Sequence, residues 1–149
     1  MTEFENHYRA LEALYLSAPI NAHFPTDIKI GDGSAEISMT IGEDHYHAAN
    51  AAHGTVYFKA LDDACFFAVA SKVTDMFVLT TNFNLNLTRP VQAGPLTARG
   101  RWVHGERRVF LAEAILLDAE GEPIARGSGT FMRSRKPLDS LAGYKLAKS

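Results

Sequence analysis

Apolar residues recur at helical spacing at the start of the chain and again near its middle. Thr2 and Glu5 have the three-residue spacing of a capping box, and apolar residues follow at every third or fourth position. This pattern predicts an amphipathic helix over residues 3–17. Residues 53–73 are apolar around most of a helical circumference, so other parts of the chain must cover this second predicted helix.

Alternating apolar and polar residues predict strands in most of the remaining chain. Residues 28–41, interrupted by Gly31-Asp32-Gly33, form either a strand pair or one bulged strand. Further strands follow the second helix, at residues 77–88, 96–104, 108–117 and 122–132. Because short turns separate them, they predict an antiparallel sheet and an α+β fold class. The basic tail, residues 133–149, is predicted to be loosely ordered.

The strand at residues 77–88 has two very different faces. Strict alternation places Leu79 and Phe83 on one face, and places Thr80 on the other face together with Asn82, Asn84 and Asn86. Asparagine has a poor strand propensity, so three of them on one face are unusual. Two interpretations stay open: a solvated outer face, or a face committed to an interface or a site.

The composition fits one domain over residues 1–149 and narrows the possible functions. A net charge of -2 argues against a nucleic-acid partner. No stretch of 18 apolar residues and no signal-like start are present, so we expect no membrane association and a mature chain. The single cysteine, Cys65, cannot form an internal disulfide, which favours a cytoplasmic location. Its apolar neighbours predict a small buried side chain rather than a nucleophile.

Three histidines, His45, His47 and His53, lie within nine residues and invite comparison with a metal site. Apart from Asp44, no carboxylate or cysteine stands nearby at a familiar ligand spacing. We therefore expect no metal site and no bound cofactor.

Two adjacent carboxylates, Asp62 and Asp63, fall inside the most apolar helix. Adjacent helical residues point about 100° apart, so both cannot face solvent equally. One is expected to face solvent beside Lys59, and the other to lie near the core, where a carboxylate usually serves as a paired charge or as a functional acid or base. Gly54, at the start of the helix, would let a ligand oxygen approach the unpaired N–H groups there.

The segment from His53 to Ala64 resembles the His-Gly-Gly…Ala-Asp-Thr-Ala helix of hotdog-fold acyl-CoA thioesterases of the phenylacetate-pathway type. The resemblance continues through Thr80 to Pro90 and through Gly105 to Gly129, and covers roughly residues 35–132. It implies a sheet wrapped around a long helix, and a homodimer joined edge to edge or a homotetramer. It also implies hydrolysis of an acyl-CoA or related thioester, with coenzyme A as part of the substrate.

The resemblance also assigns roles to single residues. Asp62 matches the carboxylate that acts as general base or nucleophile, and Gly54 matches the residue whose N–H polarises the thioester carbonyl. His53 matches the histidine that orients the site. Thr80 falls at the hydroxyl position that the facing subunit of a dimer contributes.

Two departures from the family pattern leave alternatives open. Thr55 replaces the second glycine, and His47 stands where the family commonly has asparagine, with Asn50 three residues later. Either His47 or Asn50 could serve in place of that asparagine. Residues 1–26 lie outside the resemblance and are expected to cap the sheet or line the acyl pocket. The candidates for binding the phosphates of coenzyme A are Arg89, Arg107, Arg108 and Lys136.

The departures favour one alternative from another class, a non-catalytic protein that binds acyl-CoA. A further alternative keeps the fold but hydrates or dehydrates an acyl thioester. That chemistry normally needs a histidine and an acid in another arrangement.

Overall fold

The computed structural model describes residues 2–147 and contains two α-helices and six strands. The helices are α1 (Glu3–Ser17) and α2 (Gly54–Ala70). The strands are β1 (Thr26–Gly31), β2 (Ser34–Ile41), β3 (Met76–Leu87), β4 (Gly94–His104), β5 (Val109–Leu117) and β6 (Pro123–Pro137). Short 3-10 helices follow α1, precede α2 and follow β6, at Pro19–His23, Glu43–His45 and Leu138–Ser140.

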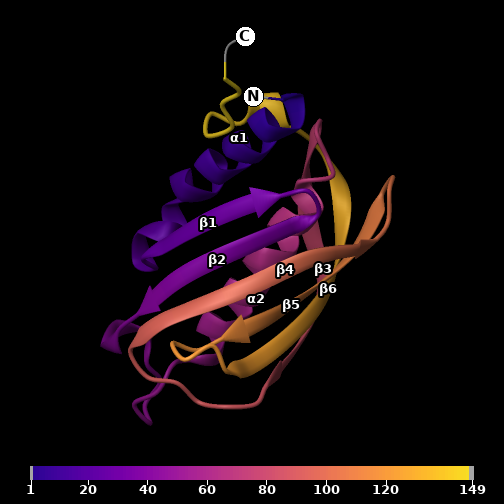
Figure 1. The fold of residues 1–149 in the computed structure, drawn as a ribbon. Coiled ribbons are helices and arrows are strands. Elements are labelled where there is room, and N and C mark those ends of the chain that lie inside the picture. The colour runs from indigo at the N-terminus through magenta and orange to yellow at the C-terminus, as the bar shows by residue number, and fades with distance from the viewer. Residues whose placement is uncertain (1, 148–149) are drawn as a thin grey trace.

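The six strands form one antiparallel sheet in the order β1-β2-β4-β5-β6-β3, and this sheet curves around α2 (Figure 1). The sheet and α2 bury a common core that includes Leu61, Phe110 and Phe131. Gly100 in β4 permits this packing, because a Cβ there would overlap the backbone of Ala64 in α2. The hotdog arrangement expected from the sequence is therefore confirmed.

The sheet has one edge covered by a helix and one edge without the usual protection. The capping box at Thr2 is present, and α1 then runs along β1. The Arg9 guanidinium donates to the Ile30 carbonyl at 2.7 Å, while the Ile30 N–H donates to the Glu12 carboxylate at 2.8 Å. At the opposite edge, β3 has 12 residues without a charge or proline, the features that usually protect an edge strand.

The carboxyl-terminal region is more ordered than predicted. β6 continues to Pro137, so the expectation of a loosely ordered tail from Arg133 is wrong for residues 133–137. The cause is long-range: β6 pairs with the whole length of β3, and Met76 lies opposite Pro137. Leu138 is buried directly after the strand, and its N–H donates to the Asp75 carbonyl at 2.9 Å.

A β-bulge near the middle of β3 changes which side chains face α2. Thr80 lies opposite Phe131 on β6, but Asn82 lies opposite Thr130, so Thr81 is an extra residue. Residues directly opposite each other on neighbouring strands share a face, and Phe131 is fully buried. Thr80 therefore faces inward, and the expectation that it shares the outer face with the asparagines is wrong.

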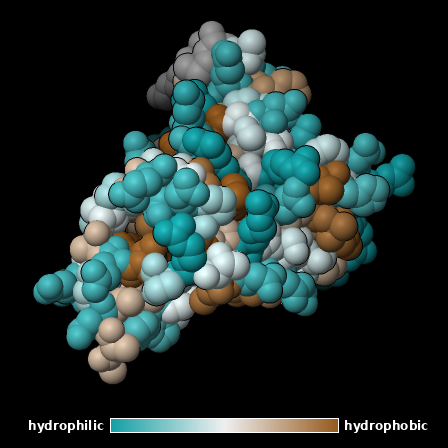
Figure 2. Space-filling view, turned by 60° about the horizontal axis from the view of Figure 1, so that its bottom comes forward, coloured by the Kyte–Doolittle hydropathy of each residue, from teal (hydrophilic) through white to brown (hydrophobic). Residues whose placement is uncertain are grey.

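The surface combines polar side chains with several apolar patches (Figure 2). Within residues 2–147, no helix is both long and apolar enough to cross a membrane. Cys65 is buried as expected, and burial raises the pKa of its thiol.

Candidate functional site

Asp62 is held on α2 by a partner from β3. The Thr80 hydroxyl, turned inward by the bulge, donates to Asp62 Oδ1 at 2.8 Å. Burial raises the pKa of Asp62 to about 6, while the hydrogen bond from Thr80 opposes this rise. Asp62 is thus a carboxylate whose proton affinity suits proton transfer near neutral pH. This contact is made within one chain, whereas the family resemblance implied a hydroxyl from a facing subunit.

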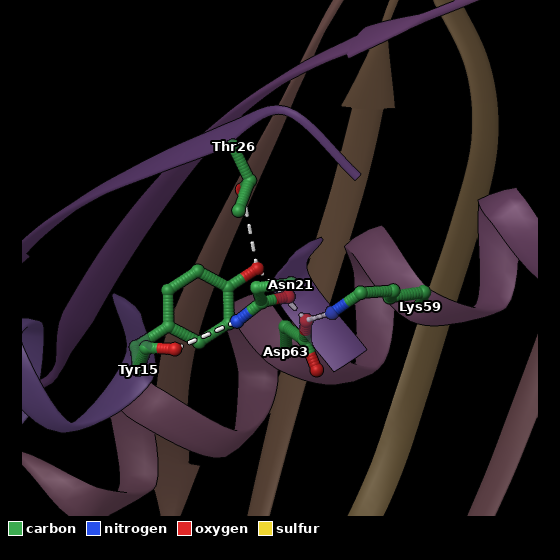
Figure 3. A network of polar contacts seen from close by, with 5 residues as sticks. All are labelled: Tyr15, Asn21, Thr26, Lys59 and Asp63. Atoms are coloured by element: carbon green, nitrogen blue, oxygen red, sulfur yellow. Dashed lines mark hydrogen bonds and ion pairs between the residues drawn. The ribbon is translucent and has the colours of Figure 1, made fainter. Parts of the chain in front are cut away.

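Asp63 faces the other way, into a polar network that joins α2 to α1 (Figure 3). Lys59 Nζ lies 2.6 Å from Asp63 Oδ2, and the Tyr15 hydroxyl donates to the same oxygen at 2.9 Å. The Lys59 ammonium also lies 5.3 Å from the centre of the Tyr15 ring. Asn21 donates through Nδ2 to the Tyr15 carbonyl at 2.7 Å, which ties the 3-10 helix after α1 to the network.

The Asp63 side chain is only 19% exposed, so the expectation that one of the two acids faces solvent beside Lys59 is wrong. Burial raises the pKa of Asp63, and the Lys59 ammonium opposes this rise. The reason is tertiary: α1 and the 3-10 helix after it cover this side of α2.

A cavity of about 580 Å³, here called the carboxylate pocket, opens beside both acids. Its lining from α2 follows helical spacing: Lys59, Asp62, Asp63, Phe66 and Phe67. The end of α1, residues 19–21, the start of β3 and residues 141–143 complete the walls. Within the extension, residues 2–26 therefore both cover an edge of the sheet and line a pocket.

The first turn of α2 presents a different kind of chemistry. His53 is the N-cap, and its Nδ1 accepts from the Thr55 N–H at 3.1 Å, which leaves Nε2 as the N–H donor. Within residues 2–147, the Gly54 N–H has no hydrogen-bond acceptor. It lies at the positive end of the helix dipole and is suited to hold an oxyanion.

Gly54 borders a second cavity of about 290 Å³, here called the helix-start pocket. His47 and Arg89 also line it, so the structure brings together three of the predicted residues. Asn50 does not line this cavity. It lies at φ 65 in the tight turn that begins at His47, and its carbonyl accepts from Gln92.

The two pockets lie too far apart to act together within one chain. Gly54 and Asp62 are eight residues apart on α2, which corresponds to about 12 Å along the helix axis. A carbonyl held by the Gly54 N–H is therefore out of reach of the Asp62 carboxylate of the same chain. The two pockets also share no lining residue.

The four basic candidates do not gather at one place. Arg89 lies at the helix-start pocket, where its guanidinium is 3.8 Å from Asp118. Arg107 and Arg108 lie in the turn between β4 and β5, and Lys136 lies near the end of β6. These three lie at the other end of the sheet from Arg89. Arg89 follows the end of β3, whereas Val109, directly after Arg108, is level with Leu79 near the start of β3, because both pair with Met132.

The three clustered histidines form hydrogen bonds with backbone groups. His45 Nδ1 accepts from the Gly42 N–H and its Nε2 donates to the His23 carbonyl, while His47 Nδ1 accepts from the Ala49 N–H. Among the described residues, no group of three or more histidine, cysteine, aspartate or glutamate side chains is arranged to hold a metal ion.

Sequence reasoning missed Tyr15 and the enclosed position of Lys59. The four-residue spacing of Lys59 and Asp63 on a helix is a recognisable signal for their ion pair. The contact of Tyr15 with Asp63 joins residues 48 positions apart and depends on how α1 packs, which no local pattern reports.

The sequence model of the thioesterase superfamily matches residues 49–125, just over half of the chain, and the chain belongs to this superfamily. The matched range includes α2 with Gly54 and Asp62, and β3 with Thr80.

Individual proteins resemble this chain in sequence or in fold. A candidate esterase of Saccharolobus solfataricus is 26% identical over 110 residues, which span 72% of each chain. The PaaI protein from the phenylacetic acid degradation operon of Escherichia coli superposes with a TM-score of 0.82 at 19% identity, covering 91% of this chain and 99% of its own. A candidate thioesterase related to phenylacetic acid degradation from Ralstonia eutropha superposes with a TM-score of 0.73 at 25% identity, covering 83% and 98%.

Proposed function

We propose that the protein hydrolyses an acyl-CoA or a related thioester, with Asp62 as the group that activates water or attacks the carbonyl. The observation that carries this proposal is the Asp62 carboxylate itself. It is oriented by Thr80, has a pKa raised to about 6, and opens onto a largely apolar pocket. A carboxylate with this proton affinity is ionised at neutral pH yet remains a competent base.

The Gly54 N–H supplies the second requirement, a donor for the carbonyl oxygen as negative charge develops on it. Gly54 has no positive φ, and a Cβ would lie 3.7 Å from Leu87, which is ordinary contact. The fold of this chain therefore does not require glycine there. Close approach of a ligand oxygen gives a reason for it.

The 12 Å between Gly54 and Asp62, about eight helical rises, points to a site shared by two copies of the chain. The open edge of β3 offers the contact. Leu87 borders the helix-start pocket, while Thr80 borders the carboxylate pocket. If two β3 strands paired antiparallel with Phe83 of one copy opposite Phe83 of the other, Thr80 of one copy would lie near Leu87 of the other. Gly54 of one copy would then approach Asp62 of its partner.

The same pairing gives the basic residues a role. Arg89 of one copy would lie at the same end of the joined sheet as Arg107 and Arg108 of the other. Arginines from two chains would then lie at the opening of the shared site, where they could bind the phosphates of coenzyme A.

A subunit-mixing experiment tests the shared site. Gly54→Val and Asp62→Asn variants, each inactive alone, are unfolded, mixed and refolded together. In a shared site, each mixed dimer keeps one intact Gly54–Asp62 pair, so about one quarter of wild-type activity returns. Release of free thiol from a panel of acyl-CoA substrates gives the measurement. If mixing restores nothing although mixed dimers are detected by mass spectrometry, the shared site is wrong.

The non-catalytic alternative gives a separate result. Thr55 is exposed beside Gly54 and bonds to His53, so the first turn of α2 differs from the two-glycine pattern. A protein that only binds would show no thiol release with any acyl-CoA, while its melting temperature would rise in the presence of acyl-CoA.

A further inference from the structure

The carboxylate pocket continues past Asp62 along α2 and becomes apolar. Phe66 and Phe67 follow Asp62 and Asp63, respectively, by four residues, which places each ring about 6 Å further along the helix axis on the side that lines the pocket. Phe77, from the start of β3, contacts Phe66 with their ring centroids 5.2 Å apart. Charged groups thus line one end of the pocket and aromatic rings the other.

The carboxyl-terminal residues 141–143 close the apolar end. Leu141 packs against the hydrophobic core although it lies after the last strand. Buried Leu138 anchors the segment on one side. On the other side, the Tyr144 hydroxyl lies 2.7 Å from Nδ1 of buried His7, whose Nε2 lies 2.9 Å from the Ala70 carbonyl.

The end of α1 meets this segment directly. A Cβ on Gly143 would overlap the Ser17 side chain, so the two segments are in close contact. Figure 1 shows the yellow carboxyl-terminal segment beside α1. Ala18, which follows α1, also lines the pocket. The end wall is therefore built by the two terminal parts of the chain, both outside the range 49–125 that matches the superfamily.

We propose that this apolar chamber binds the acyl group of the substrate, and that Leu141 and Ala18 set the largest acyl group that fits. The proposal rests on the proposed function, because it places the thioester carbonyl at Asp62. The substrate class is a medium-sized apolar acyl thioester, alkyl or aryl, in preference to a short one such as acetyl. Three phenylalanines and Leu141 offer such a group apolar contact that acetyl is too short to reach.

The test compares kcat/KM for acetyl-, butanoyl-, octanoyl-, dodecanoyl- and benzoyl-CoA. We expect wild type to favour octanoyl- or benzoyl-CoA over acetyl-CoA at least tenfold, and the leading substrate decides between alkyl and aryl. Leu141→Ala should move the alkyl optimum toward dodecanoyl-CoA, with about a fourfold gain for each additional buried methylene.

Leu146→Ala is the matched control, since Leu146 lies in the same segment, is 54% exposed and does not line the pocket. It should leave the profile unchanged. Ala18→Phe fills the chamber and should move the optimum toward butanoyl-CoA. Equal effects of Leu141→Ala on all chain lengths, or equal effects of Leu141→Ala and Leu146→Ala, would overturn the proposal.

A binding measurement separates this proposal from the proposed function. Thioether analogues of the same acyl-CoA series cannot be cleaved, so the rise they cause in melting temperature reports occupancy alone. If wild type cleaves none of the thioesters, but the rise depends on chain length and shifts in Leu141→Ala, then the hydrolase assignment fails and the chamber stands. A rise independent of chain length in both proteins contradicts the chamber even if hydrolysis is observed.

Discussion

The start of α2 and its middle carry complementary chemical groups, but the groups at the start are open to solvent and those in the middle are enclosed. At the start, His53 is exposed and Gly54 offers a backbone N–H without an acceptor within residues 2–147. In the middle, Asp62 and Asp63 are enclosed by β3, α1 and the segment after β6. The chain thus encloses both carboxylates and leaves the Gly54 N–H, the proposed oxyanion donor, open.

This difference follows from what each group needs. Burial is the largest cause of the raised pKa of Asp62 and of Asp63, and the chain provides it by packing its own terminal segments over α2. A backbone N–H at a helix start has its polarity from the helix itself and needs only an accessible approach. Predictions about the two places should therefore differ in kind, with substitutions in the middle of α2 affecting proton transfer and those at its start affecting carbonyl binding.

The largest effect is expected for Asp62→Asn, which removes the base or nucleophile. We expect kcat to fall about 10³-fold, within the range typical of lost general-base catalysis. Thiol release from acyl-CoA gives the measurement. Activity that survives in purified Asp62→Asn would show that another group performs the reaction.

Stability supplies a control for this variant. Burial raises the pKa of Asp62 to about 6 in the folded protein, above its unfolded value of 3.8, so wild type loses stability as pH rises through this window. The asparagine variant has no such loss. At pH 8 it should be more stable by on the order of 1–2 kcal/mol, and at pH 4 the difference should vanish.

Two glycine substitutions contrast the start of α2 with its packed middle. Gly54→Ala should reduce kcat/KM about 10²-fold with an unchanged melting temperature, because only the approach to the oxyanion donor is narrowed. Gly100→Ala should instead lower the free energy of unfolding by about 1–3 kcal/mol, because the new methyl overlaps Ala64. Activity assays and chemical denaturation of both variants give the comparison. Equal loss of stability in both would remove the distinction.

The smallest effect concerns the pH profile. Since the base must be ionised, kcat/KM should rise with pH up to about 6 and then level off. Thr80→Val removes a hydrogen bond to the ionised carboxylate, so the rise should move to higher pH by about one unit. Thr80→Ser keeps the donor and should retain the wild-type profile. An unchanged profile in Thr80→Val would mean that Thr80 does not act on Asp62.

Local patterns predicted the elements that local physics determines. The capping box at Thr2 and the apolar spacing after it define α1, which spans Glu3–Ser17 as expected. Most strands were located within about two residues, because alternation and turns are local signals. β6 is the exception, since pairing with β3 extends it beyond the apolar alternation.

The candidate site also combines features that local sequence predicts with features that depend on the fold. The chemical types at Gly54 and Asp62, and their positions on one helix, are legible in the sequence. The direction of Thr80 was not, because one extra residue in β3 reverses every later side chain on the strand. The enclosure of Asp63 by Tyr15 also depends on a contact between distant parts of the chain.

The helices, the antiparallel sheet, the family resemblance and the candidate base could all be predicted from the order of the residues alone. Helix capping, periodicity and turn chemistry act over a few residues, so one chain read in order contains them. The fold was needed to show that the Thr80 hydroxyl reaches Asp62 within one chain, that Tyr15 encloses Asp63, and that the terminal segments close the carboxylate pocket. These facts depend on packing between segments far apart in the sequence, where burial and distance are set by the whole fold.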